Sequence, residues 1–179
     1  MLPTIQNRQR SLPIDTPALR RLCICLYALA CDDTAAKRRR AGRRTADDKR
    51  PPFDIKNLET VTLVICGDSL ISRVHAAVFS DPSTTDVITI PYEATPLSGP
   101  SAEIFVNARL ARDIGNGLRQ NETQPAGSAC ADTAAAQLEL ALYIAHGFDH
   151  LAGWDDHSPG GRTAMRKREL SWLEICNKQ

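Results

Sequence analysis

Apolar residues recur along the chain in two alternating patterns. Short β-rich runs occupy residues 4–10, 61–66, 86–90 and 103–106, and turn-forming or polar residues separate each run from the next apolar stretch. Between these runs, apolar side chains recur at helical spacing from residue 16 onward and over 69–79, 108–118, 132–150 and 162–176. This alternation predicts an α/β (α+β) fold, with a small mixed β-sheet packed against helices.

The length of the chain indicates one domain. Its 179 residues are enough to bury a core, and we expect a single domain over 1–179. No apolar run approaches the length of a membrane span, so we expect no membrane partner. The first residues also lack the basic-then-apolar order of a secretory signal, which favours a cytoplasmic location.

One segment departs from this pattern. Eight of the 22 basic residues lie between Lys37 and Arg50, and Pro51 and Pro52 come directly after them. Because the segment has no apolar period, we expect a disordered insertion at about 35–52. Such a charge run either attracts phosphate backbones or is a solvated loop without a partner, and the sequence leaves both interpretations open.

The six cysteines form no C-x-x-C pair. Their spacing is typical neither of a zinc ribbon nor of a thioredoxin-like site. We therefore expect small buried hydrophobic residues in a reducing compartment.

Three of the four histidines fall within residues 146–157. His146 and His150 are four apart, so on a helix both imidazoles can reach one metal ion. Gly153 is suited to end that helix and turn the chain back, which brings Asp156 or His157 round as a third ligand. Three protein ligands leave an open position, as in catalytic metal sites. The alternative is a pair of ordinary surface or core histidines.

The residue after the first histidine limits the chemistry. Zinc peptidases of the H-E-x-x-H type carry a glutamate there as general base, whereas this chain has Gly147. The sequence therefore argues against a zinc peptidase.

The segment 146–156, HGFDHLAGWDD, resembles the signature H-G-x-L-H-L-x-G-Y-D-H of the YbeY family. Residues 85–91, TDVITIP, are similar to the family's T-D-V-L-S-F-P strand, and 102–104, AEI, stand where the family has G-D-I or G-E-I. The resemblance extends from about Val61 to the end of the chain. It implies a single-strand-specific, zinc-dependent endoribonuclease that matures the 3′ end of small-subunit rRNA and acts in ribosome quality control.

The resemblance also implies a ligand set. One Zn²⁺ would lie on His146, His150 and Asp156, where Asp156 stands in place of a family histidine and His157 is the alternative. The family's RNA-cleaving arginine falls at Phe79, for which Arg73 is a conceivable substitute. Beyond a metal-bound water, the resemblance leaves the catalytic groups and the substrate-binding residues unknown.

The implied partners are single-stranded RNA, in particular rRNA, and the small ribosomal subunit. Two other functions stay open. One is a zinc-binding ribosome-assembly factor that binds RNA or a ribosomal protein without cleaving, which the phenylalanine at position 79 favours. The other is a metal hydrolase with a different substrate.

Overall fold

The structure, a computed structural model, describes residues 1–40, 53–120 and 129–178. Within these ranges, β1 (Leu2–Asn7), β2 (Thr60–Cys66), β3 (Val87–Tyr92) and β4 (Ser101–Asn107) form one sheet in the order β1-β2-β4-β3. The first, second and fourth strands are parallel, and β3 runs antiparallel to β4 at the edge. The mixed sheet predicted from the sequence is thereby confirmed.

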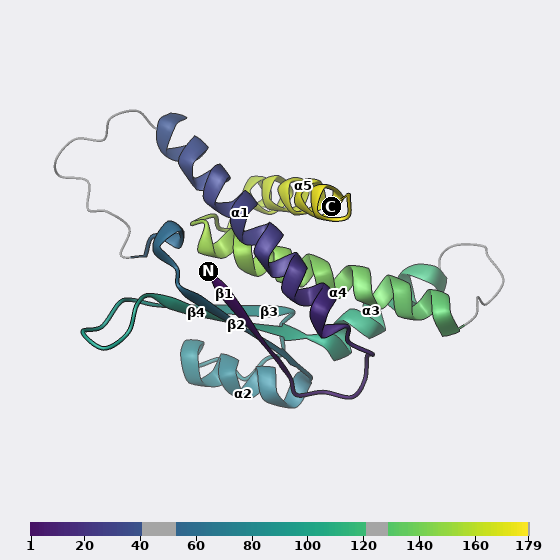
Figure 1. Ribbon diagram of the computed structural model, residues 1–179. Coiled ribbons are helices and arrows are strands. Elements are labelled where there is room, and N and C mark those ends of the chain that lie inside the picture. Colours follow the sequence, from purple (N-terminus) through teal and green to yellow (C-terminus); the bar gives the residue numbers. More distant parts are fainter. Residues whose placement is uncertain (41–52, 121–128, 179) are drawn as a thin grey trace.

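Helices cover the two faces of the sheet unequally (Figure 1). The helix α2 (Asp68–Phe79) lies on one face, above a small cluster of Cys66, Ile71 and Ile88. On the other face lie α1 (Thr16–Arg40), α4 (Ala129–Leu151) and α5 (Pro159–Cys176), and α3 (Ala108–Gln120) packs along α4. The main core fills the space between the sheet and these helices.

The burial of the strands follows from this arrangement. In β2, residues 63–66 are all buried, as expected for a central parallel strand covered on both faces. The edge strand β3 is more exposed toward its end and contains Pro91, which an edge strand tolerates because one of its sides forms no ladder hydrogen bonds.

Several boundaries differ from the prediction by a few residues; β1, for example, spans Leu2–Asn7 rather than 4–10, and α5 begins at Pro159 rather than at residue 162. The helix α1 continues to Arg40, so residues 35–40 are helical rather than part of a disordered insertion. Alanine, lysine and arginine are good helix formers, which accounts for the longer helix. The rest of the predicted insertion, residues 41–52, lies outside the described residues. The helix α4 begins at Ala129 and not at residue 132.

The expectation of six free thiols is wrong for two of the cysteines. Cys25 and Cys176 form a disulfide with a Cα–Cα distance of 5.9 Å, and it joins α1 to the end of α5. The two residues are 151 positions apart, so their proximity arises from the packing of the two helices and not from a sequence motif. Cys23 and Cys66 are buried as expected, and Cys31 is half-buried.

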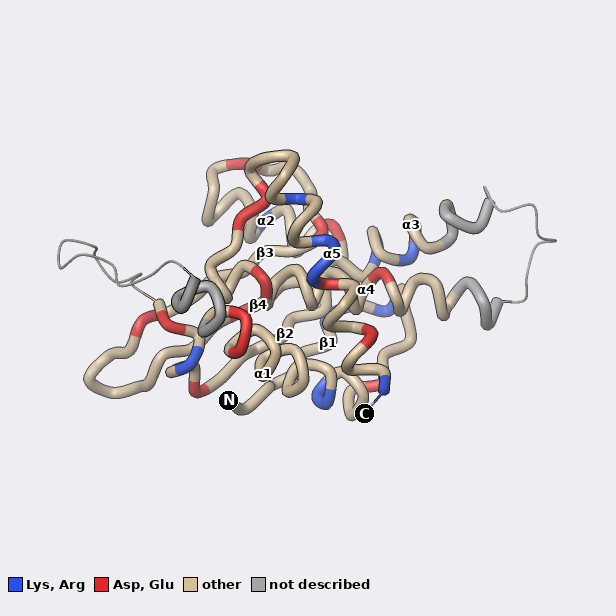
Figure 2. Tube along the Cα trace, turned by 90° about the horizontal axis from the view of Figure 1, so that it is seen from above, with Lys and Arg blue, Asp and Glu red and all other residues tan. Residues whose placement is uncertain are grey.

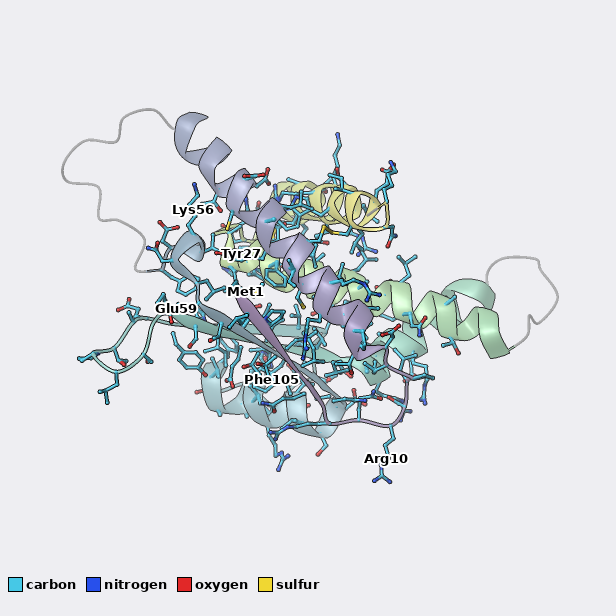
Figure 3. The ribbon with its side chains drawn as sticks, viewed as in Figure 1. Met1, Arg10, Tyr27, Lys56, Glu59 and Phe105 are labelled. Carbon is cyan, nitrogen blue, oxygen red and sulfur yellow. A yellow bond between two sulfur atoms is a disulfide. The ribbon has the colours of Figure 1, made fainter. Side chains whose placement is uncertain are left out.

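A second contact ties α1 to the segment before β2. The Tyr27 hydroxyl donates a hydrogen bond of 3.2 Å to the carbonyl of Lys56, in the short helix η1 (Ile55–Asn57), and Figure 3 shows the two residues side by side. Among the described helices, none combines the length and apolar composition that crossing a bilayer requires.

Candidate metal centre

The candidate site begins where α4 ends. Gly153 has a φ of +82°, a left-handed conformation that favours glycine. Its amide donates to the His150 carbonyl at 2.9 Å, and the Trp154 amide donates to the Asp149 carbonyl at 3.2 Å. The turn predicted at Gly153 is confirmed, and it carries the next residues of the chain back toward the histidines.

His146, His150 and Asp156 come together at this turn. One candidate ligand atom from each lies within 4.8 Å of the others. The two histidine Nε2 atoms are 3.1 Å apart, and the nearer Asp156 oxygen lies 3.9 Å from His146 Nε2. Two imidazoles and a carboxylate are a donor set that suits Zn²⁺. His157 is exposed and lies outside this group.

The Nδ1 atom of each imidazole forms a hydrogen bond that orients the ring. Nδ1 of His146 donates to the buried carboxylate of Glu169 at 2.6 Å, and Nδ1 of His150 donates to the Trp154 carbonyl at 3.1 Å. A carbonyl oxygen only accepts, so this bond leaves Nε2 of His150 unprotonated and available to a metal. Such partners fix the tautomer and ring orientation of metal-binding histidines.

The electrostatics of the two histidines differ. For His146, burial lowers the pKa, but the hydrogen bond and charge of Glu169 outweigh it and the net pKa is raised. For His150, burial and the neighbouring His146 lower the pKa, which favours the neutral form that binds metal. The site therefore combines one imidazole whose pKa is raised with one whose pKa is lowered.

A buried ion pair supports the same turn. Arg168 of α5 makes two hydrogen bonds, of 2.7 and 2.9 Å, to the carboxylate of Asp149, whose side chain is fully buried. The pKa of Asp149 is raised to about 6 because burial outweighs the effect of Arg168. The same guanidinium lies 4.1 Å from the centre of the Trp154 ring. Trp154 is thus a packing partner of Arg168, which covers one face of its ring.

A cavity of about 490 Å³ opens beside the three residues. Its cationic lining side chains are Arg162 and Arg166, both exposed and both on α5. Figure 2 shows basic and acidic positions next to each other along this helix. Asp86 also lines the cavity, and its carboxylate accepts from the Val87 amide at 2.8 Å, so it caps the start of β3 as well.

The cavity does not include the residues suggested for the family arginine. Phe79 and Arg73 are on α2, which covers the opposite face of the sheet from α4 (Figure 1). Phe79 is 57% exposed and contacts His75. The structure therefore gives no support to Arg73 as a substitute and places arginines of α5 at the cavity instead.

The helix α4 packs closely against the sheet at Gly147, the residue after His146. A Cβ added at Gly147 would lie 2.6 Å from Ile104 Cγ2 of β4 and 3.2 Å from Thr89 Oγ1 of β3. A glutamate at this position would collide with the sheet. Close packing against the sheet thus explains why position 147 holds a glycine and not the glutamate of the peptidase motif.

Sequence reasoning missed the contribution of α5. Arg162, Arg166 and Glu169 recur at helical spacing and all line the cavity. This periodic polar face is a signal that could have marked them as one group. Nothing in the sequence, however, relates that face to the histidines of α4.

Comparisons with known proteins find one family whose model matches most of the chain. Residues 32–177 match the family described as Endoribonuclease YbeY. A Rhodopirellula baltica protein named Endoribonuclease YbeY is 31% identical over 116 residues, which are 65% of this chain and 53% of that protein. The chain thus spans about half the length of that relative. A Chlamydia felis protein of the same name is 24% identical over 168 residues, covering 92% of this chain and 84% of its own.

A solved structure shares the fold. The solution structure of a Thermotoga maritima protein matches with a TM-score of 0.51 and 15% sequence identity, over 98% of this chain and 89% of that one. At this identity the likeness shows the architecture alone.

Proposed function

The chain belongs to the YbeY family, and on this premise we propose that it is a metal-dependent endoribonuclease that cleaves single-stranded RNA. The observation that carries the proposal is the convergence of His146, His150 and Asp156 at the mouth of a cavity lined by two arginines. This arrangement combines a metal-binding donor set with cations that suit phosphate.

Zn²⁺ is the metal that we propose, with one ion per chain on His146, His150 and Asp156. Three protein ligands and the lining of an open cavity fit a catalytic zinc site, which keeps a position for water or substrate. When bound, the ion would act as a Lewis acid toward the phosphodiester and lower the pKa of a coordinated water. His157 remains the alternative third ligand, but its exposure outside the group supports Asp156.

The residues around the ligands prepare the site. Glu169 and the Trp154 carbonyl orient the two imidazoles, while Arg168 contacts both Asp149 and Trp154, on either side of the turn at Gly153. Arg162 donates to the Asp156 backbone carbonyl at 2.9 Å and so holds the third ligand's segment. Arg166 makes no hydrogen bond or ion pair with any described residue, which leaves its guanidinium available to a phosphate.

The finer features of the proposal come from the family resemblance. We propose that the substrate is rRNA, that the reaction matures the 3′ end of the small-subunit rRNA and serves ribosome quality control, and that the protein acts in the cytoplasm with the small ribosomal subunit. A second candidate is a zinc-binding assembly factor that does not cleave. The observation in its favour is Phe79, which stands where the family has an arginine.

Metal content and RNA cleavage test the proposal together. Protein purified without chelators should contain about one zinc per chain by mass spectrometry, as three-ligand sites do. It should cut single-stranded RNA, and His150→Ala and Asp156→Ala should each lose both zinc and cleavage. His157→Ala is the matched control and should keep both.

The other outcomes separate the candidates. Zinc binding without cleavage of any single-stranded RNA would favour the assembly factor. Wild-type protein that takes up no metal after reconstitution would overturn the hydrolase proposal. Loss of zinc in His157→Ala but not in Asp156→Ala would show that His157, and not Asp156, is the third ligand.

A further inference from the structure

The cavity continues along α4, away from Asp156. Its lining includes three aliphatic side chains, which we call the aliphatic wall (Leu110 and Ile114 of α3 and Leu142 of α4), and the polar residues Glu139 and Tyr143 of α4. The whole cavity, at about 490 Å³, falls within the range of roughly 300 to 1,000 Å³ that is usual for small-molecule pockets. It therefore has room for more than the scissile phosphate.

The hydroxyl of Tyr143 lacks a hydrogen-bond partner. The residue is 5% exposed, and within the described part of the chain its buried Oη neither donates nor accepts. Buried hydroxyls are nearly always satisfied, because an unpaired one loses its bonds to water without replacement. An orphaned hydroxyl in a cavity wall therefore points to a ligand.

Glu139 lies one turn earlier on the helix, and its carboxylate also has no partner within the described part of the chain. The residue is 9% exposed, and no side chain or backbone group of the described residues forms a hydrogen bond or ion pair with its carboxylate. The charged groups that act on it are Arg166, which favours the ionised form, and Asp86, which opposes it. A carboxylate in the wall of a cavity, with most of its residue buried, is suited to accept hydrogen bonds from a ligand.

We propose that Glu139 and Tyr143 form a nucleobase subsite that selects guanine. This inference rests on the proposed function, because it takes the ligand to be a nucleotide of the RNA substrate. The edge of guanine presents N1–H and the N2 amino group side by side, so one carboxylate can accept both. The adjoining O6 can accept a hydrogen bond from a tyrosine hydroxyl. The aliphatic wall of Leu110, Ile114 and Leu142 would cover the base.

The other bases fit this pair of groups less well. Adenine and cytosine present one amino donor beside a ring nitrogen acceptor, which would repel the carboxylate. Uracil presents a single N–H between two carbonyl oxygens. A site that holds buried polar groups for one hydrogen-bonding pattern rejects analogues that leave those groups unpaired. The aliphatic wall also argues against a hydrated Mg²⁺ ion, which prefers oxygen ligands and retains water.

The subsite and the metal centre lie on one face of one helix. Glu139, Tyr143 and His146 succeed one another at intervals of four and three residues, so their side chains share a stripe along α4. All three line the same cavity, together with Arg162 and Arg166. A bound nucleotide could therefore place its base against Glu139 and its phosphate near the arginines and the metal ligands. This would make the enzyme cut at a fixed position relative to a guanosine.

Mononucleotide binding tests the subsite without requiring cleavage. The probes are guanosine, inosine and adenosine 5′-monophosphates, titrated by calorimetry into the full-length protein. We expect GMP to bind at least about tenfold more tightly than AMP, equivalent to about 1.4 kcal/mol. IMP lacks only the N2 amino group and should fall between them. Glu139→Gln should remove the preference and Tyr143→Phe should reduce it, while the exposed Glu174→Gln serves as control and should keep it.

Equal affinities for GMP and AMP would overturn the proposal, as would an unchanged preference in Glu139→Gln or no binding of any of the three at millimolar concentration. Cleavage mapping on single-stranded RNAs with one guanosine at varied positions provides the second measurement. Cuts that ignore the guanosine would overturn the subsite and leave the nuclease standing. Selective GMP binding by a protein that cuts no RNA would overturn the nuclease and leave the subsite.

Discussion

The two ends of the cavity along α4 differ in how their polar groups are paired. At the end with the candidate metal ligands, called the metal end here, His146 is bound to Glu169 and His150 to the Trp154 carbonyl, and the neighbouring Asp149 is bound to Arg168. At the other end, neither the buried hydroxyl of Tyr143 nor the carboxylate of Glu139 has a hydrogen-bond partner among the described residues. The two regions lie only a turn or two apart on the same helix.

The two ends therefore differ in whether the protein itself supplies partners for their polar groups. The metal end receives its partners from α5 and from the turn at Gly153, so its side chains are oriented before any ligand arrives. Preorganised ligands with supporting hydrogen bonds are what a metal site requires. The other end lacks such support, in keeping with a subsite that its substrate completes.

The largest expected effect comes from removing the support of Asp149. In Arg168→Met the buried carboxylate would lose its bidentate partner, and we expect the free energy of unfolding to fall by about 3 to 5 kcal/mol. Urea unfolding followed by circular dichroism measures the change. Lys167→Met, an exposed neighbour on the same helix, is the control and should stay within about 0.5 kcal/mol. Similar stabilities of the two variants would refute the role of the ion pair.

A smaller effect is expected from a side chain added at Gly147, where α4 packs against the sheet. In Gly147→Ala the new methyl group would overlap Ile104, and we expect a loss of about 1 to 3 kcal/mol in the free energy of unfolding. Gly160→Ala is the matched control, since a Cβ there meets nothing within 4 Å. Thermal unfolding of both variants would show the difference, and an equally stable Gly147→Ala would mean that α4 is free to shift.

The pairing of His146 can be weakened without a large change in stability. Glu169→Gln keeps the shape of the side chain but replaces the charged acceptor of the Nδ1 hydrogen bond, so we expect zinc affinity to fall about 10- to 100-fold. Competition with a chromophoric chelator measures this affinity. The exposed Glu174→Gln on the same helix should bind zinc like the wild type. Unchanged affinity in Glu169→Gln would show that the paired end does not depend on this bond.

The sequence predicted the elements well where local patterns determine them. Each β-rich run and each helical periodicity corresponds to an element of the expected type, and the turn that follows α4 has its positive φ at Gly153. Residues 35–40, which the sequence assigned to the insertion, belong to α1, since charged residues with good helix propensity continue a helix as readily as they form a loop. The order of the strands depends on long-range pairing, which no local pattern encodes.

The site was predictable only as far as it lies on one segment. His146, His150 and Asp156 are close in sequence, so helix geometry and one turn were enough to bring them together. Glu169 and Arg166 come from another helix, and their proximity depends on how α5 packs on α4. The Cys25–Cys176 disulfide escaped prediction for the same reason.

The smallest expected effect concerns the unpaired end and its response to pH. Burial raises the pKa of Glu139 above its ordinary value of 4.5, while Arg166 partly opposes this. Just above the ordinary pKa, the folded protein therefore binds more protons than the unfolded chain, and its free energy of unfolding falls as the pH rises. In Glu139→Gln this contribution is absent. The stability of the variant relative to wild type should thus increase between about pH 4 and pH 7, as urea midpoints across that range would show. A difference that stays constant with pH would mean that the carboxylate is as well solvated in the fold as in the unfolded chain, and the contrast between the two ends would disappear.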